Sequence, residues 1–213
     1  MIRHAGHAVP WVRMGLACGL VAILMELVRW NPWVLWPLEG TAVGLLAGAS
    51  AWCFDEPAAA VVDTLPRGAG WRAAARTPAL VLLLATWTVV ALHAGDDVLF
   101  GHVRAVLVQG LTALFGGAAL AVWARGRGES TPGMRIAAVV VPVSTVWALV
   151  RPLHQQLPVF PYGTSSATDW QASTTGWALV ATVSVLCLIF SLTRPWGSSI
   201  PGRQPRGARP SAS

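Results

Sequence analysis

The sequence contains no lysine, and charge of either sign is scarce. All fifteen basic residues are arginine, and charged residues make up 11% of the 213, whereas a soluble domain carries about a quarter. Without lysine the chain cannot hold a phosphate-binding loop of the G-x-x-x-x-G-K-[ST] type or form a lysine Schiff base. No nucleophile, base and orienting residue occur together either, so we expect no catalytic residues and no enzyme activity.

Cysteine is also rare and carries no metal spacing. Cys18, Cys53 and Cys187 lie far apart, each within or at the end of an apolar stretch. Such residues are typical of packing positions and not of disulfides or metal ligands. We therefore expect no metal site.

Hydrophobic residues are abundant instead. They form 54% of the chain, and the mean hydropathy is +0.57. A helix needs about 20 apolar residues to cross the hydrocarbon of a bilayer. Six stretches approach this length: 11–28, 33–53, 78–94, 102–123, 135–150 and 175–192. The sequence predicts an all-α, polytopic membrane protein with six transmembrane helices in one domain, 1–194, and a disordered tail at 195–213 that is rich in Pro, Gly, Ser and Arg.

The arginines predict how the chain is oriented. They cluster at the ends of the apolar stretches, which is typical of membrane topology and not of a continuous nucleic-acid-binding face. With the N-terminus inside, twelve of the fifteen lie in cytoplasmic segments, and Arg29, Arg104 and Arg151 lie outside. The positive-inside rule thus places both termini in the cytoplasm, and we expect no nucleic-acid partner.

Glycines recur every four residues in the second stretch, at Gly40, Gly44 and Gly48. This spacing puts them on one helical face and allows the backbone of another helix to approach closely. Two interpretations remain open: tight packing within one bundle, or an interface with another subunit.

A few ionisable residues lie near the predicted outer boundary. Glu26 and Glu39 fall inside predicted spans, where an ionisable group is costly unless it is paired or hydrated. The basic residues that approach the same level are Arg29, His93, Arg104 and Arg151. They could line a substrate pathway or gate; alternatively, they form a structural latch or extend their side chains to water.

The connection between the second and third stretches reads FDEPAAAVVDTLPRGAGWRAAAR, from Phe54 to Arg76. Acids stand beside Pro57, which favours the start of a helix, and Pro66 ends the run. The pattern predicts a short amphipathic helix on the cytoplasmic side, followed by a bend that leads along the membrane surface into the third span. Taken alone, this is either an interfacial loop with arginines on anionic lipid or a docking element for a cytoplasmic partner.

This block resembles the cytoplasmic block of small actinobacterial ABC transporter permeases of the ABC-2-like kind. Their "DEPA" opening, small-residue helix and Trp/Arg-rich elbow have counterparts here, and "DWQASTTGWALV", 169–180, is similar to their entry into the last span. The resemblance implies a permease in a bacterial plasma membrane. It further implies that the block couples to a separate ATP-binding subunit, which carries ATP and Mg, and that a second permease chain completes the transporter. The implied coupling residues are Asp55, Glu56, Pro57, Asp63, Pro66, Arg67, Trp71, Arg72 and Arg76.

The sequence therefore leads to two functional hypotheses. The first is the permease subunit of an ABC-type exporter, which couples ATP hydrolysis by its partner to substrate movement. The second is a non-transporting accessory or scaffold subunit of a larger membrane complex, favoured by the glycine-rich faces and by the scarcity of polar residues at mid-span.

Overall fold

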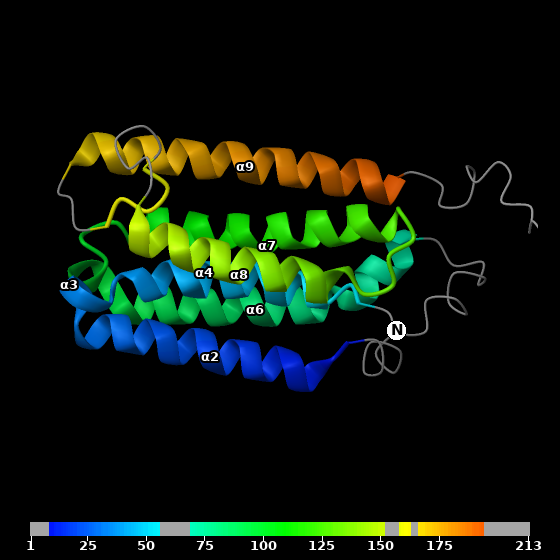
Figure 1. Cartoon of the computed structure of the whole chain (residues 1–213), viewed down its shortest axis with the longest axis horizontal. Coiled ribbons are helices and arrows are strands. Elements are labelled where there is room, and N and C mark those ends of the chain that lie inside the picture. Colours follow the sequence, from blue (N-terminus) through cyan, green and yellow to red (C-terminus); the bar gives the residue numbers. More distant parts are fainter. Residues whose placement is uncertain (1–8, 56–68, 152–157, 163–165, 194–213) are drawn as a thin grey trace, which may run out of the picture.

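The computed structural model describes residues 9–55, 69–151, 158–162 and 166–193, and within these ranges it contains seven α-helices and no strand. The predicted helix at 57–65 and the tail at 195–213 lie outside the described residues. The long helices run side by side in one bundle (Figure 1). Their bounds are α2 Trp11–Trp30, α3 Pro32–Leu35, α4 Pro37–Trp52, α6 Ala69–Val98, α7 Val103–Arg125, α8 Pro132–Val150 and α9 Ala167–Thr193.

Five of these helices are long and apolar enough to cross a membrane. They are α2, α7, α8, α9 and the part of α6 from Ala73 to Val98. The shortest, α8, has 19 residues, which corresponds to about 29 Å of helix, close to the thickness of bilayer hydrocarbon. The prediction of an all-helical chain is confirmed for the described residues, and the five helices indicate a multi-pass membrane protein.

The stretch predicted as a single span at 33–53 is divided in the structure. It forms the four-residue helix α3 and the 16-residue helix α4, which meet at Trp36. The reason is Pro37, which has no N–H to donate to the preceding turn. The backbone hydrogen bond from the Glu39 amide to the Trp36 carbonyl joins residues three apart, whereas an α-helix joins residues four apart. On its own, α4 is shorter than the helices that can cross a membrane.

Helix α6 is longer than the stretch 78–94 predicted for it. It begins at Ala69, so Trp71, Arg72 and Arg76 belong to the same helix as the apolar stretch, and Gly70 lies in its first turn and not at a bend. Pro78 is accommodated inside the helix. The helical path is broken at Gly95, whose φ of 77° is in the left-handed region that glycine tolerates.

Helix α4 occupies the centre of the bundle and packs against α2, α7 and α8. Its glycine stripe faces α8: a Cβ atom on Gly40 would lie 2.5 Å from the Ala148 Cβ, and one on Gly48 would lie 3.0 Å from the Ala137 Cβ. On α7, a Cβ on Gly117 would lie 2.0 Å from the Ala47 carbonyl oxygen. Because glycine has no side chain, the backbones of α4, α7 and α8 approach one another closely within this one chain.

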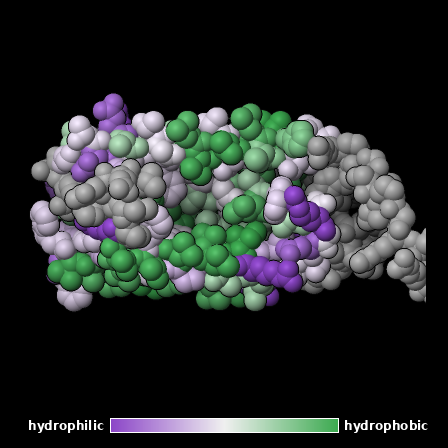
Figure 2. Space-filling model, turned by 45° about the horizontal axis from the view of Figure 1, so that its top comes forward, coloured by the Kyte–Doolittle hydropathy of each residue, from purple (hydrophilic) through white to green (hydrophobic). Residues whose placement is uncertain are grey.

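The outward surface of the bundle is apolar. Leu, Val, Ile and Phe side chains of α2, α6, α8 and α9 are exposed along most of their length. On the face shown in Figure 2, hydrophobic residues cover the middle of the bundle and hydrophilic residues lie toward its ends. This distribution matches a bilayer, which solvates apolar side chains in its interior and polar ones at its surfaces.

The bundle has two ends. The Glu39 end is where α2 ends and α4 begins. The Asp55 end, opposite, is where α4 ends and α8 begins.

Candidate functional site

A cluster of polar side chains is buried at the Glu39 end. Glu39, from the first turn of α4, and Gln109, from α7, are each 1% exposed, and Tyr162, from the segment before α9, is fully buried. The Tyr162 hydroxyl lies within hydrogen-bond distance of the Glu39 Oε1 and 2.6 Å from the Gln109 Oε1. Three segments that are far apart in the sequence thus meet at one hydroxyl group.

The Tyr162 hydroxyl can satisfy both of its neighbours in this cluster. It carries one proton and two acceptor lone pairs, so it can donate to the Glu39 carboxylate and accept from the Gln109 amide, whose oxygen and nitrogen ends exchange places by a half-turn. Leaving a buried polar group without a partner costs about 1–3 kcal/mol, so the cluster depends strongly on the Tyr162 hydroxyl.

Arg151 closes the cluster from the end of α8. It has left-handed backbone angles (φ 48°, ψ 50°), and its Nη2 donates to the Tyr162 carbonyl oxygen. Its guanidinium lies 3.8 Å from the centre of the Trp36 ring, a cation–π contact. Burial lowers the pKa of Arg151 from its ordinary value. Arg151 therefore joins α8 to the segment around Tyr162.

Aromatic rings attach α9 to this cluster. Trp170 stacks on His102 with ring centroids 4.1 Å apart and meets the Tyr162 ring edge-on at 5.5 Å. The Trp177 Nε1 and the Ser173 hydroxyl both donate to the Val159 carbonyl oxygen. Trp170 and Tyr162 are buried, so this end of α9 is firmly attached.

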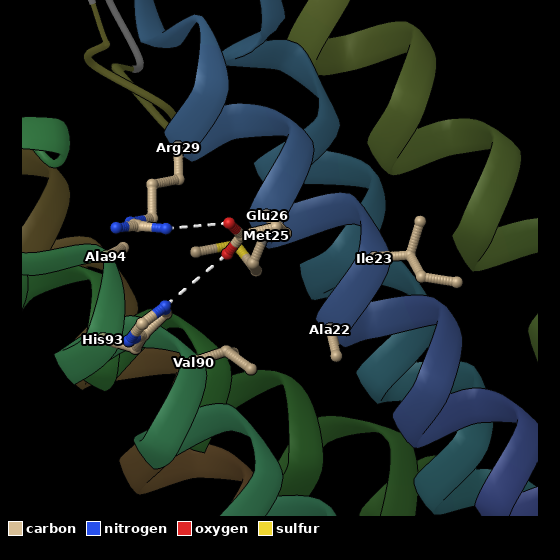
Figure 3. Close-up of a pocket in the computed structure, with 8 residues that line it drawn as sticks. All are labelled: Ala22, Ile23, Met25, Glu26, Arg29, Val90, His93 and Ala94. Atoms are coloured by element: carbon tan, nitrogen blue, oxygen red, sulfur yellow. Dashed lines mark hydrogen bonds and ion pairs between the residues drawn. The ribbon is translucent and has the colours of Figure 1, made fainter.

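A second group of charged residues lies in a groove between α2 and α6 at the same end (Figure 3). The Arg29 Nη1 is 2.8 Å from the Glu26 Oε1, and the His93 Nε2 is 3.7 Å from the Glu26 Oε2. Unlike the buried cluster, all three side chains are substantially exposed. The groove has a volume of about 370 Å³, and its other lining residues are Ala22, Ile23, Met25, Val90 and Ala94.

The six residues predicted to line a pathway or gate therefore separate into three places. Glu26, Arg29 and His93 meet in the exposed groove. Glu39 and Arg151 belong to the buried cluster, linked through Tyr162. Arg104, on the first turn of α7, is exposed. Whether any of them contacts a substrate stays a prediction.

At the Asp55 end, Asp55 is held inside the protein. The Gly133 backbone amide, in the first turn of α8, donates to the Asp55 Oδ1 at 2.6 Å. Thr131, at the N-cap position of α8, makes no side-chain capping bond, so Asp55 supplies the acceptor that a helix start needs. Burial raises the pKa of the Asp55 carboxyl above its ordinary value, and the hydrogen bond from Gly133 opposes this rise.

Among the other predicted coupling residues, Arg76 is also buried. Its guanidinium lies 5.7 Å from the centre of the Phe54 ring, so α6 contacts the segment that follows α4. Trp71 lies in the first turns of α6 and is half-buried. The predicted residues Glu56, Pro57, Asp63, Pro66 and Arg67 lie outside the described residues, and for Arg72 the structure describes only the helical backbone.

Gln109, Tyr162 and the capping contact of Asp55 were not identified as site features from the sequence. Gln109 could have been recognised from the sequence, because it is the one amide side chain in the apolar run VRAVLVQGLTALF of α7. Tyr162 is the only tyrosine in the chain, which marks it without indicating a partner. The Asp55 contact with Gly133 joins residues 78 apart, a separation that no local pattern reveals.

The chemistry available to these sites is hydrogen bonding and charge pairing. Within the described ranges no three His, Cys, Asp or Glu side chains come together as metal ligands. Comparison of the chain with models of protein families, with curated proteins and with solved structures gives no match.

Proposed function

We propose that this chain is the transmembrane permease subunit of an ABC-type exporter in a bacterial plasma membrane. In this proposal α3 and α4 together form a sixth crossing between α2 and α6, and both termini lie in the cytoplasm, so that the Asp55 end faces the cell interior. The distribution of arginines supports this orientation.

The observation that carries the proposal is the anchoring of the described residues on either side of positions 56–68. On one side Asp55 bonds to the first turn of α8. On the other side Arg76 of α6 packs against Phe54. A segment on which a partner pushes must be connected firmly to the spans it moves, because a loosely attached loop would absorb the displacement. Attachment to α4, α6 and α8 at once is suited to that task.

The partners follow from the same proposal. The absence of lysine leaves no phosphate-binding loop of the usual kind in this chain, so ATP and Mg would be bound by a separate cytoplasmic subunit. One six-span chain would supply half of a pathway, and a second permease chain, identical or different, would supply the rest.

The test is purification of the tagged full-length chain from its native membranes, followed by identification of bound subunits and measurement of ATPase activity. We expect an ATP-binding subunit with a phosphate-binding loop to copurify. Asp63→Arg should reduce its recovery, and Glu129→Arg should not. Glu129 is a matched control because it is an acid between α7 and α8 at the Asp55 end, outside the connection. Absence of such a subunit, or equal loss in both variants, would contradict the proposal.

A scaffold subunit is the second candidate, and the packing of α4 favours it. A Cβ added to Gly40, Gly44 or Gly48 would clash with α8. A Cβ added to Gly117 of α7 would clash with Ala47 of this central helix. Stable copurification with a membrane complex that contains no ATP-binding subunit would favour the scaffold function over the permease.

A further inference from the structure

The groove between α2 and α6 combines charge and apolar surface in a definite order. Arg29 lies one residue before the end of α2, and Glu26 and His93 lie beside it. Toward the middle of the bundle the walls become apolar, with Ala22 and Val90. From Ala22 to Arg29 the helix rises about 10 Å. The polar part is thus at the membrane surface and the apolar part points inward, as in a lipid molecule.

We propose that this groove is a binding site for one phospholipid, with its phosphodiester on Arg29 and His93 and the upper part of one acyl chain along Ala22 and Val90. The site is independent of the transport proposal, since it requires only that α2 and α6 lie in a bilayer.

The unused hydrogen-bond donors of Arg29 select the phosphate group. Glu26 is contacted by Arg29 through one oxygen and approached by His93 through the other, so Glu26 and Arg29 form a pair without net charge, and recognition depends on hydrogen bonds. Arg29 uses one nitrogen, Nη1, on Glu26, and a guanidinium carries five N–H donors in a planar fork. The remaining donors of this half-exposed side chain can bind phosphate oxygens, a geometry for which arginine is well suited.

The position of the charges points to a lipid and not to a free anion. Glu26, Arg29 and His93 face outward on two helices whose neighbouring exposed residues, such as Ile23, Leu27 and Val89, are apolar. Charged groups on a membrane-facing surface are costly unless they meet polar headgroups. The volume of about 370 Å³ also exceeds what a phosphate ion alone would fill, and it lies within the range of about 300–1,000 Å³ typical of organic ligand sites.

The experiment is native mass spectrometry of the purified full-length chain in detergent, titrated with dioleoyl-phosphatidylglycerol. Dioleoylglycerol, which has the same chains without phosphate, and inorganic phosphate are the comparison probes. We expect a one-to-one complex with the phospholipid, weaker binding of dioleoylglycerol, and no displacement of the phospholipid by inorganic phosphate.

Two variants test the two halves of the site. Arg29→Gln removes the charge that meets the phosphate and should weaken binding roughly ten- to a hundredfold, the worth of a charge-assisted hydrogen bond. Ala22→Phe fills the apolar part without altering any charge and should also reduce binding. Circular dichroism in the same detergent checks that each variant keeps its helical content, and the conclusion rests on whichever variant does.

Arg104→Gln is the matched control, because Arg104 is an exposed arginine at the same end of the bundle on α7, away from the groove. It should leave binding unchanged. Equal loss in Arg104→Gln would show general attraction to headgroups and overturn the proposal, as would displacement by inorganic phosphate. If the chain instead runs as a dimer that Ala22→Phe dissociates, the groove holds a second copy and the lipid site is refuted.

Discussion

Helix α4 buries twelve of its sixteen residues, whereas α9, with 27 residues, buries Trp170, Ser173 and Ser184. Both helices are strongly apolar, so hydropathy does not distinguish them. Helix α4 is surrounded by α2, α7 and α8, while α9 packs chiefly on α7 at one side of the bundle (Figure 1). The two helices therefore show how little a hydrophobic run says about burial in a membrane protein.

The difference lies in side-chain size. Every fourth residue of α4 from Gly40 to Gly48 is glycine, and alanines fill much of the rest. The surface of α9 instead presents leucine, valine, isoleucine and phenylalanine. Lipid tails solvate large apolar side chains as well as a protein interior does, so helices associate where small residues permit close contact. Small residues at helical spacing thus indicate burial where hydropathy cannot.

A large effect is expected from filling one of the close contacts of α4. Gly117→Ala places a Cβ 2.0 Å from the Ala47 carbonyl oxygen and 2.2 Å from the Ser50 Oγ. The backbone of α4 would have to move, and overpacking of this kind costs about 3 kcal/mol. Thermal unfolding in detergent, followed by circular dichroism, should show a large decrease in the midpoint.

Gly176→Ala on α9 is the control for this change. A Cβ at Gly176 meets no atom within 4 Å, and alanine is the better helix former by about 1 kcal/mol. The midpoint should therefore stay the same or rise slightly. A similar loss in both variants would mean that the central packing of α4 is not what separates the two helices.

The helical class and the approximate places of most spans could be predicted from the sequence. Helix α2 begins at Trp11 and α7 begins within one residue of the predicted 102, because a long apolar run bounded by polar residues leaves few alternatives in a bilayer. Pro37 does not by itself predict the division at Trp36, since a proline can be accommodated inside a helix, as Pro78 is in α6.

The candidate site was less accessible from the sequence. Glu39 was identified as costly at its depth, but Gln109 and Tyr162, which contact it or its partner, lie 70 and more residues away. Their meeting depends on which helices become neighbours, and no local spacing encodes that. The resemblance to ABC-2-like permeases implies a docking role for Asp55; its capping bond to Gly133 gives it a role inside the chain.

The next largest effect concerns Tyr162, which links the two compared helices by contacting Glu39 of α4 and Trp170 of α9. Tyr162→Phe keeps the ring contacts but leaves Glu39 and Gln109 without the hydroxyl. We expect a loss of about 2 kcal/mol, the cost of an unpaired buried polar group, measured by unfolding in detergent.

Glu39→Gln serves as the comparison for Tyr162, because its amide oxygen can still accept the hydroxyl proton and its size is nearly unchanged. It should cost less than Tyr162→Phe. The reverse order would show that the carboxylic group itself, and not the shared hydroxyl, stabilises this end of α4.

A smaller effect is expected at the other end of α4. Asp55→Ala removes the acceptor at the start of α8 and should cost about 1 kcal/mol, as loss of a helix cap does. Asp55→Asn keeps an acceptor for the Gly133 amide and should cost less.

Because burial raises the pKa of Asp55 in the folded state, the folded protein binds the proton more tightly than the unfolded chain.

The sign of the pH dependence follows. The contribution of Asp55 to the free energy of unfolding is fully present below its ordinary pKa of about 3.9, and it decreases as the pH rises through the higher folded-state value. Unfolding midpoints measured from pH 4 upward should therefore decrease more in the wild type than in Asp55→Asn. Parallel curves would mean that the carboxyl is effectively hydrated and does not serve as the buried cap of α8.

The smallest effect is expected on the outward face of α9. Leu186 is 60% exposed and Leu46 of α4 is fully buried, so the same leucine-to-alanine substitution compares the two helices directly. In Leu46→Ala the neighbours leave a cavity, which costs about 2–5 kcal/mol in a protein interior. In Leu186→Ala lipid or detergent chains fill the space, and the change should stay within about 0.5 kcal/mol. Unfolding of both variants in the same detergent measures the difference. A loss at Leu186 as large as that at Leu46 would show that the outward face of α9 is covered by protein and not by lipid, because only a fixed partner leaves a cavity behind.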